Sequence, residues 1–294
     1  MMSRLKTNLR DASFFLGEAV VPKTIRYSGM MGSLRRQMIY WARDSFVLSY
    51  PKCGRTWLRT MIGHVMDRHY NLNLKNPMEI QHLWKLSSDI PCIGFSHDDS
   101  PNLKRASAIQ TDKSRYRSKN ILLLVRDPRD VVVSYYFDAR FRMNIFDGSI
   151  NEFLAQDVGS IASVVAFYNA WAQARHHVKS FKLLTYEDMH RDPKNSLISA
   201  LSFLGVENVP EALIDDAIEF GSFENLRKIE TADAFGHERM RPADQSNPDS
   251  FKVRRGKAGG YVDYFSAEEI AYMDRHIETL DPMFAVYKRS CITA

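Results

Sequence analysis

Residues 45–57 read SFVLSYPKCGRTW, which joins a short apolar run, a turn and the first residues of a helix. The apolar run at 46–48 is typical of a buried strand, and Lys52 and Gly54 fall in the turn that follows it. Backbone N–H groups at the N-terminus of a helix favour a bound anion, and the lysine adds a full positive charge. The lysine precedes the glycine here, unlike in a Gly-x-x-x-x-Gly-Lys-Ser/Thr loop. The stretch therefore predicts a phosphate site for a donor other than ATP with magnesium.

A second segment, ILLLVRDPRDVVVSYYF at 121–137, repeats the layout of strand, charged turn and helix. Its unbroken apolar run predicts a parallel strand that is buried on both faces, and Pro128 suits the first turn of the following helix. Arg126 ends the strand and Ser134 lies two helical turns further on, so both side chains are candidates for one phosphate. Arg129 and Asp130 fit a solvated helix start equally well, and we assign them no role.

The rest of the chain alternates in the same way between helical and strand patterns. Helices are expected over 56–69 and 160–178, and a strand over 181–185. Asp192-Pro193 predicts the start of a helix that Gly205 ends, and Pro210 starts the next one. The polar segment 230–260 is expected to be a long loop. This alternation predicts an α/β fold with a central parallel β-sheet flanked by helices.

These segments resemble those of the cytosolic-type sulfotransferases, which use 3′-phosphoadenosine 5′-phosphosulfate (PAPS) as sulfuryl donor. The family's YPKSGTTW-like and RxPxDxxxSxYxF-like segments correspond to YPKCGRTW and RDPRDVVVSYYF in this chain. Three further landmarks lie in the family's order: a strand that ends in His97, between these two segments, and after them the string YEDM at 186–189 and RRG at 254–256. The resemblance implies a single P-loop-type domain over 45–294. Residues 1–44 would form an N-terminal arm that packs on the core or lies at the acceptor mouth.

The same resemblance implies a donor site without a metal ion. The first loop would hold the 5′-phosphosulfate. The segment 126–137 and the loop around RRG at 254–256, called the late loop below, would hold the 3′-phosphate. Aromatic side chains would contact the adenine. Core packing is the alternative for each of these aromatic residues. The implied cofactor-binding residues are Lys52, Cys53, Gly54, Arg55, Thr56, Trp57, Arg126, Ser134, Tyr186, Phe223, Arg254, Arg255 and Gly256.

His97 and Lys52 are the predicted catalytic residues. Sulfuryl transfer needs a base on the acceptor hydroxyl, or less favourably an amine, and positive charge on the leaving oxygen. An imidazole can accept a proton at neutral pH, whereas any one of nine histidines can equally be a core or surface residue. Asp98 and Asp99 could orient His97 or cap the next helix. The position in the family favours His97 as general base, with Lys52 stabilising the leaving phosphate.

The chain departs from the family pattern at several positions. Arg55 replaces a threonine of the loop, and Phe95 stands where animal cytosolic enzymes have a lysine that contacts the sulfuryl group. Whether Arg55 compensates is open. Cys53 could be a reactive thiolate beside the lysine or a small core side chain, and we favour the latter. The family's short dimerisation segment has no match at 262–271, so no dimer is predicted. A bacterial or otherwise divergent member fits these differences.

Composition bounds the class of protein. The 294 residues are 45% hydrophobic and 26% charged, which is typical of a globular protein that is long enough for one large domain. A net charge of +5 with interspersed acidic residues does not indicate nucleic-acid binding. No apolar run reaches the ~18 residues that span a bilayer, and no signal peptide is recognisable. The three cysteines have neither disulfide-framework nor zinc spacing, so we expect a cytoplasmic location.

The acceptor is the least determined part of the reaction. A small molecule, a lipid or a carbohydrate would fit, and Phe137, Phe141, Met143, Phe146 and segment 76–100 are plausible pocket walls or core. A P-loop kinase-like phosphotransferase is the first alternative, with Asp127 near a strand end as a magnesium ligand. Cys53 stands where such an enzyme has a serine or threonine after the lysine, which argues against it. A non-catalytic nucleotide-binding module is the second alternative.

Overall fold

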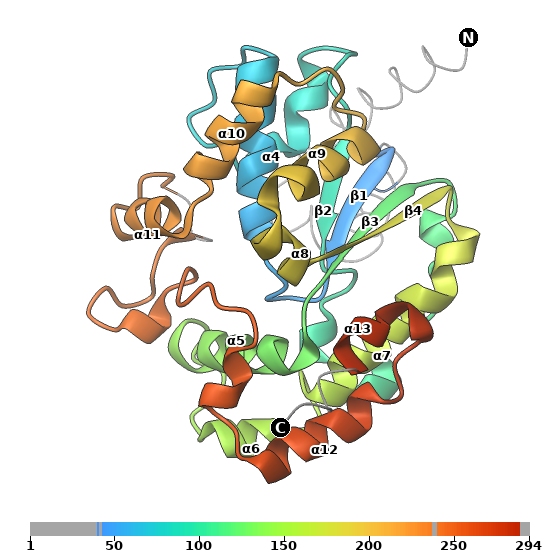
Figure 1. Cartoon of the computed structure of the whole chain (residues 1–294), viewed down its shortest axis with the longest axis vertical. Helices are drawn as coiled ribbons and strands as arrows, with labels where there is room; N and C mark the ends of the chain where they lie inside the picture. The colour runs from blue at the N-terminus through green and yellow to red at the C-terminus, as the bar shows by residue number, and fades with distance from the viewer. Residues whose placement is uncertain (1–39, 41–42, 237–239, 289–294) are drawn as a thin grey trace, which may run out of the picture.

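Four parallel strands form the centre of the molecule (Figure 1). The computed structural model describes residues 40, 43–236 and 240–288. Strands β1 (Ser45–Ser49), β2 (Ile93–Ser96), β3 (Asn120–Val125) and β4 (Ser180–Thr185) lie in the order β2-β1-β3-β4. Strand β1 pairs with β2 on one side and with β3 on the other. The loop after β1 therefore lies at the carboxyl end of the sheet where the strand order reverses, which is where ligands bind in open parallel sheets. The predicted parallel α/β fold is confirmed.

Local sequence signals account for the helix boundaries. Asp127 caps the helix that begins at Pro128, and Asp192 caps the one that begins at Pro193, each through a backbone N–H. Gly205, with φ of +84°, ends the second of these helices as predicted. The helices are α4 (Arg55–His69), α5 (Pro128–Phe141), α6 (Ile150–Leu154), α7 (Ile161–Ala174), α8 (Tyr186–Arg191), α9 (Pro193–Leu204), α10 (Glu211–Phe220), α11 (Phe223–Thr231), α12 (Ala267–Ile277) and α13 (Ala285–Lys288).

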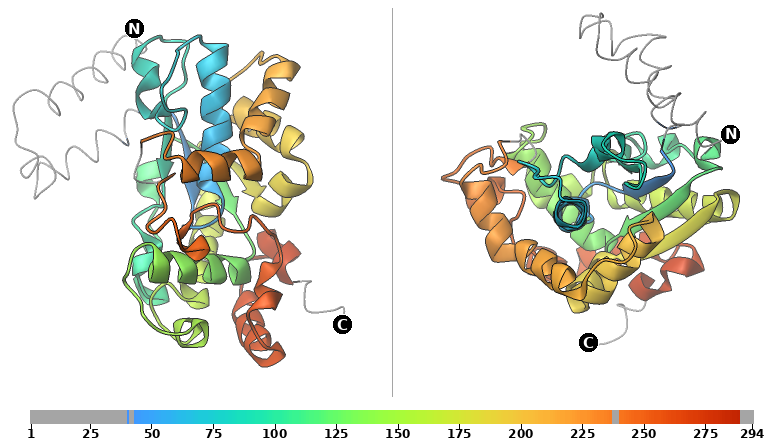
Figure 2. Two further views of the ribbon diagram at one scale, coloured as in Figure 1. Left: turned by 90° about the vertical axis from the view of Figure 1, so that its left-hand side faces the viewer. Right: turned by 90° about the horizontal axis from the view of Figure 1, so that it is seen from above.

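Helices cover the sheet and the ends of its strands. Helices α4 and α9 pack on the face that is turned toward the viewer in Figure 1, while α5, α7 and α12 pack together beyond the carboxyl ends of the strands. Helix α10 packs on α4, α11 follows α10, and the segment 248–263 returns along α5 (Figure 2). Residues 230 and 231 of the predicted loop 230–260 are the end of α11 instead. The segment 248–263, most of which belongs to that predicted loop, has short 3₁₀ turns at Pro248–Ser250 and Gly260–Asp263. It closes one side of the space in front of the strand ends.

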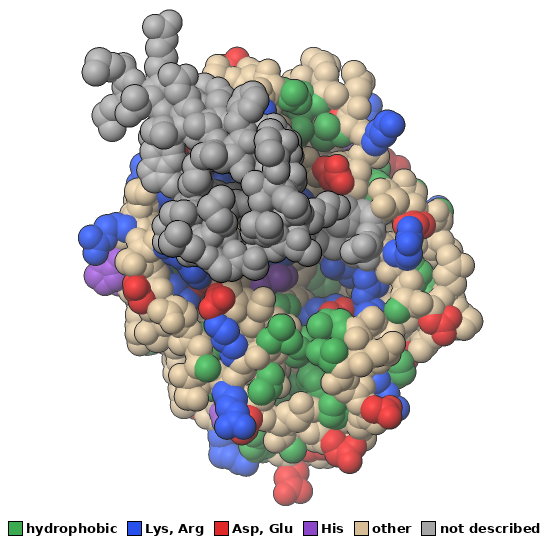
Figure 3. All heavy atoms as spheres, turned by 180° about the vertical axis from the view of Figure 1, so that it is seen from behind, with side chains coloured by type: hydrophobic (Ala, Val, Ile, Leu, Met, Phe, Trp, Pro, Cys, Tyr) green, Lys and Arg blue, Asp and Glu red, His purple; other side chains and the backbone are tan. Residues whose placement is uncertain are grey.

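The predicted N-terminal arm lies almost entirely outside the described residues. Within it, Tyr40 stacks on Phe46 of β1 with ring centroids 5.3 Å apart. On the face that Figure 3 shows, lysine and arginine side chains are interspersed with aspartate and glutamate. The surface visible there therefore has the mixed charge expected from the composition.

Candidate active site

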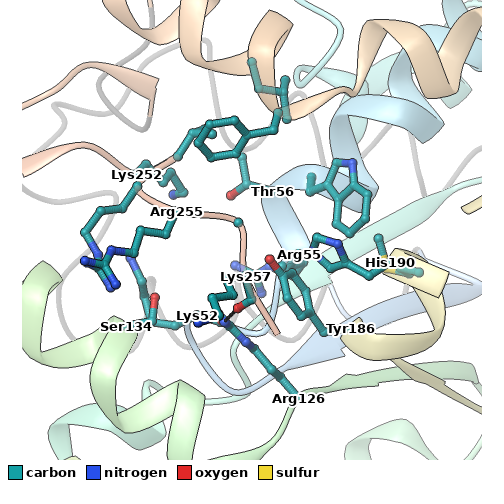
Figure 4. A pocket seen from close by; sticks show the side chains of 18 of the residues that line it. Lys52, Arg55, Thr56, Arg126, Ser134, Tyr186, His190, Lys252, Arg255 and Lys257 are labelled. Atoms are coloured by element: carbon teal, nitrogen blue, oxygen red, sulfur yellow. Dashed lines mark hydrogen bonds between the residues drawn. The ribbon is translucent and has the colours of Figure 1, made fainter. Parts of the chain in front are cut away.

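The ends of all four strands meet at one cavity of about 650 Å³. Because Leu48 pairs with both Ser96 and Leu123, the turns after β1, β2 and β3 begin at the same level. His97 follows β2, Arg126 follows β3 and Tyr186 follows β4, and all three line the cavity with the loop after β1. The parallel register thus brings together residues from four distant parts of the chain (Figure 4).

The loop after β1 has the strained backbone of an anion cradle. Lys52 and Gly54 adopt positive φ values of 75° and 88°, and Gly54 directly precedes the first turn of α4, which contains no acidic residue. A Cβ on Gly54 would lie 2.5 Å from Cδ2 of Tyr186, so a side chain is excluded there by contact as well as by φ. Within the described residues no side chain caps α4, so its first N–H groups are left for a ligand, as an anion site requires.

Lys52 is held in the cavity by an acidic residue that we did not predict. Its Nζ lies 2.8 Å from Oδ1 of Asp138 on α5, and both side chains are mostly buried. Burial alone would raise the pKa of Asp138, but the charge and hydrogen bond of Lys52 outweigh it and hold that pKa below its usual range. Asp138 is therefore an ionised partner of the loop lysine.

The side chain of Cys53 lies in the core and not in the cavity. It is fully buried and within hydrogen-bond distance of the Tyr168 hydroxyl, with Sγ and Oη 3.4 Å apart. Burial raises the pKa of the thiol to about 12. The thiolate alternative is wrong, and only the backbone of Cys53 remains available to a ligand.

A second group of cations lies where the late loop crosses the end of β3. Arg126 donates from Nη2 to the carbonyl oxygen of Lys257 at 2.8 Å, and its guanidinium lies 4.2 Å from the centre of the Tyr186 ring. Ser134 of α5, Arg255 and Gly256 line the same part of the cavity (Figure 4). The other late-loop arginine, Arg254, lines the cavity but stacks on Phe137 and donates to the Tyr264 hydroxyl at 2.6 Å. The predicted 3′-phosphate residues are thus neighbours.

The expectation of a solvated start for α5 is wrong. Arg129 is fully buried between Asp127 and Asp274, and Asp130 is 2% exposed. Asp130 accepts hydrogen bonds from the backbone N–H groups of Gly259 and Tyr261, at 2.7 and 3.0 Å. The start of the helix therefore anchors the late loop. Since Asp127 caps α5 and pairs with Arg129, it is engaged structurally rather than turned toward a ligand.

Aromatic side chains line a further part of the cavity, where the Tyr186 ring adjoins Arg126. Trp57 and Phe223 border the cavity together with Tyr186. His190 of α8, which we did not predict, lies with its ring centroid 4.9 Å from that of Trp57 and 4.6 Å from that of Tyr186. Burial, followed by the charge of Arg126, lowers the pKa of His190, so a neutral imidazole completes this group of rings.

His97 is oriented by the backbone of β1. Its Nδ1 lies 3.0 Å from the carbonyl oxygen of Ser49, which can only accept, so Nδ1 carries the hydrogen. In the neutral ring Nε2 then has the lone pair that a general base needs. The suggestion that Asp98 or Asp99 orients His97 is not supported. Asp98 is buried against Lys113 and Trp171, and Asp99 pairs with Lys104.

The expected aromatic wall for an acceptor lies elsewhere. Phe137, Phe141 and Phe146 pack with Tyr136 and are absent from the cavity lining, and Met143 is exposed on the surface. From the segment 76–100, Met78 and His97 reach the cavity. Arg59, Asp138, Met240, Lys252 and Val253 also line the cavity. Three of these five residues are charged, so the cavity wall carries more charge than the sequence suggested.

Comparison with known proteins defines the class. A family model described as the sulfotransferase domain matches residues 42–288, so the chain belongs to the sulfotransferase domain family. Flavonol 3-sulfotransferase of Flaveria bidentis is 25% identical over 260 residues, which are 80% of each chain. Mouse sulfotransferase 1B1 is 25% identical over 267 residues, 84% of this chain and 82% of the relative. The predicted class, a PAPS-dependent sulfotransferase, is confirmed by this membership.

Solved structures show the same fold. A mouse sulfotransferase complexed with PAP has a TM-score of 0.58 at 17% identity, covering 86% of this chain and 89% of that one. Retinol dehydratase in complex with androsterone and the inactive cofactor PAP has a TM-score of 0.52 at 18% identity, covering 80% and 79%. Within residues 40, 43–236 and 240–288, no helix has the length and apolarity to cross a membrane. In the same described part, no three His, Cys, Asp or Glu side chains gather as a metal site.

Proposed function

We propose that this enzyme transfers the sulfuryl group of PAPS to an acceptor hydroxyl, with His97 as general base and Lys52 on the leaving phosphate. The observation that carries the proposal is the position of His97. It lies in the same cavity as the loop lysine, and the Ser49 carbonyl fixes the ring with Nε2 as the basic atom. A base, an anion cradle and a charged loop are the parts that an in-line transfer needs.

The donor would lie across the cavity from the aromatic end to Lys52. The adenine is assigned to the group of Trp57, Tyr186 and Phe223, with His190 beside it. The 3′-phosphate is assigned to Arg126 and Ser134, supported by the backbone and side chains of the late loop at 254–257. The 5′-phosphosulfate is assigned to the loop 52–56, where the α4 N–H groups and the Thr56 hydroxyl are available to its oxygens.

The chemical step follows from these positions. The acceptor oxygen attacks sulfur, the bond from sulfur to the bridging oxygen breaks, and Nε2 of His97 takes the hydroxyl proton. Negative charge builds up on the departing 5′-phosphate, where Lys52 would stabilise it. Lys52 bonds to Asp138 at 2.8 Å, so it would exchange this partner for the bridging oxygen when the donor is bound.

The acceptor remains a small-molecule, lipid or carbohydrate hydroxyl, or less favourably an amine. The charged residues Arg59, Asp138 and Lys252 in the cavity wall support an acceptor with polar groups around its hydroxyl. We place the enzyme in the cytoplasm, where the free thiols of the buried residues Cys53 and Cys92 suit the reducing conditions.

Calorimetric titration tests the donor without knowledge of the acceptor. Adenosine 3′,5′-bisphosphate should bind tightly with magnesium or with EDTA, and ATP should bind weakly in both. Preference for ATP with magnesium would support the kinase alternative instead.

A screen of hydroxyl and amine acceptors with labelled PAPS then tests the base. His97→Ala should lose turnover and keep its affinity for adenosine bisphosphate, because the base contacts the acceptor and not the nucleotide. His176→Ala, which removes an exposed histidine far from the cavity lining, is the matched control. Full turnover in His97→Ala would remove His97 from this role. Binding without turnover in the wild type, for any acceptor, would favour the non-catalytic alternative.

A further inference from the structure

Lys252 lines the cavity from the segment before the RRG string (Figure 4), and the charges of Lys52 and Asp138 act on its side chain. No pattern in the sequence singles it out, because it precedes the RRG string of the resemblance by two residues. Its side chain is half-buried and borders the cavity. Lys252 is therefore a cation beside the reaction centre that the assignments above leave without a role.

The backbone of Lys252 is fixed by a buried carboxylate. Glu230 of α11 is 0% exposed and accepts hydrogen bonds from the N–H groups of Lys252 and Val253, at 2.6 and 2.8 Å. Arg142, just after α5, bonds to Glu230 at 3.1 Å and to the Ser250 carbonyl at 3.2 Å. This network ties the segment 250–253 to two helices. The side chain of Lys252 is therefore directed into the cavity by a rigid support.

The charges around Lys252 are mostly positive. Lys52 and Arg55 face it from the loop and first turn of α4, and Asp138 and Arg142 face it from α5 and the residue after that helix. Asp138 is the one carboxylate in this set, and it is shared between Lys52 at 2.8 Å and Arg142 at 3.4 Å. Among the residues that the structure describes, no carboxylate lies within ion-pair distance of Lys252 Nζ. A half-buried ammonium at the cavity wall in such surroundings is suited to an anionic ligand.

We propose that Lys252 is a second cation of the phosphosulfate site and that its ammonium group binds the sulfonate of the donor beside Lys52. The inference rests on the donor placement proposed above, which brings the phosphosulfate to Lys52. The 3′-phosphate has its own cations at Arg126 and the late loop, so Lys252 is available to the other end of the donor. Lys252 stays protonated during transfer. It orients the sulfonate while the bond to the bridging oxygen breaks and the bond to the acceptor oxygen forms.

The pKa of Lys252 makes this role measurable as proton uptake on donor binding. Burial, followed by repulsion from Lys52, lowers the pKa of Lys252 to about 7. Without the donor, the neutral amine would therefore predominate at pH 8. A bound sulfonate favours the charged form, so donor binding should be accompanied by uptake of nearly one proton at Lys252. His190, whose pKa is also lowered, lies at the aromatic end and would respond to the nucleotide part that both ligands below share.

Calorimetry with PAPS and with adenosine 3′,5′-bisphosphate, in the absence of an acceptor, tests the proposal. Lys252→Met should weaken PAPS binding about tenfold or more relative to bisphosphate binding, because only PAPS carries the sulfonate. Lys257→Met is the matched control from the same loop. Its lysine pairs with Asp263 near the 3′-phosphate residues, so its loss should leave the ratio of the two affinities unchanged.

Titrations at pH 8 in two buffers of different ionisation enthalpy measure the proton. PAPS binding to the wild type should take up nearly one proton more than PAPS binding to Lys252→Met. Lys252→Arg should restore PAPS affinity without this uptake, because arginine is already charged. Unchanged PAPS affinity in Lys252→Met, or an equal loss for both ligands, would overturn the contact with the sulfonate. If the wild type bound neither PAPS nor the bisphosphate, the proposed donor site itself would be contradicted. If the wild type bound both and Lys252→Met behaved like the wild type, only the role of Lys252 would be contradicted.

Discussion

Asp130 and Gly259 are 129 residues apart in the chain, and the N–H of Gly259 donates to Oδ2 of Asp130 at 2.7 Å. The same carboxylate accepts from Tyr261, so one side chain at the start of α5 shapes the turn of the late loop. Arg126 also reaches this loop, through the Lys257 carbonyl. The end of β3, the start of α5 and the late loop therefore form one unit around the proposed 3′-phosphate site.

Asp130→Ala should lower the affinity for adenosine 3′,5′-bisphosphate about tenfold or more, because the late loop loses two hydrogen bonds to a charged acceptor. The affinity for AMP, which has no 3′-phosphate, should change much less. Isothermal titration with both nucleotides measures the difference. Asp130→Asn keeps one acceptor oxygen and serves as the milder variant, with thermal melting as a check that both are folded. Equal losses for the two nucleotides would contradict a role of the loop at the 3′-phosphate.

Arg126→Ala tests the same site from the strand side. A guanidinium that contacts a phosphate contributes about 1.5–3 kcal/mol, so bisphosphate affinity should fall roughly 10–100-fold. AMP affinity should fall far less. Arg191→Ala removes an arginine whose side chain is 77% exposed on α8 and is the matched control. Similar losses for bisphosphate and AMP would show that Arg126 does not read the 3′-phosphate.

Asp138→Asn separates the two effects of the carboxylate on Lys52. The neutral amide no longer competes with the donor for the ammonium group, nor repels the phosphosulfate, so bisphosphate affinity should rise about three- to tenfold. Turnover should fall, because Lys52 loses the partner that holds it in the cavity at 2.8 Å. Titration and initial rates measure the two effects. Asp147→Asn, which alters an exposed aspartate after α5, is the control and should change neither the bisphosphate affinity nor the turnover. A loss of affinity in Asp138→Asn would show that the ion pair assists donor binding.

Features coded by neighbouring residues could be predicted from the sequence. Asp192-Pro193 and Gly205 act within one turn of the helix that they start or end, and both boundaries are confirmed. The apolar runs of β1 and β3 and the turns that follow them identified the strand ends at the cavity. The family pattern placed Lys52, His97 and Arg126 in order, and the parallel register brings all three to one cavity.

Features that depend on distant segments could not be predicted. Lys52 and Asp138 are 86 residues apart, and their contact requires α5 to cross the end of β1 with one particular side turned toward the loop. Successive residues of a helix point about 100° apart, so the sequence could not decide that Asp138 and not Phe137 faces the cavity. Lys252 likewise depends on Glu230 and Arg142, which fix its backbone from two other elements. These contacts depend on how distant elements pack together, and the pattern of neighbouring residues in the sequence does not determine that packing.

The lowered pKa of Lys252 predicts how the stability of the empty enzyme depends on pH. The pKa is about 7 in the folded protein and near 10.4 in an unfolded chain, so the unfolded state binds more protons between these values. The folded state is therefore penalised fully below pH 7, and the penalty decreases as the pH rises from 7 toward 10.4. Its physical cause is a charged amine that is partly removed from water and repelled by Lys52, Arg142 and Arg55.

Lys252→Met should remove this penalty and raise the melting temperature of the ligand-free protein, more at pH 6 than at pH 9. The methionine keeps the unbranched shape of the side chain, so packing against the cavity wall is largely retained. Thermal melts of wild type and variant at the two pH values measure the effect, with Lys194→Met, which removes a surface lysine paired with Glu211 and Asp215, as the control. A variant less stable than wild type at pH 6 would mean that Lys252 has an attractive partner in the empty site. If Lys252→Met is instead more stable, as expected, the variant gains stability while it loses affinity for the donor. Such opposite effects are expected where like charges are held close together to bind an anionic ligand.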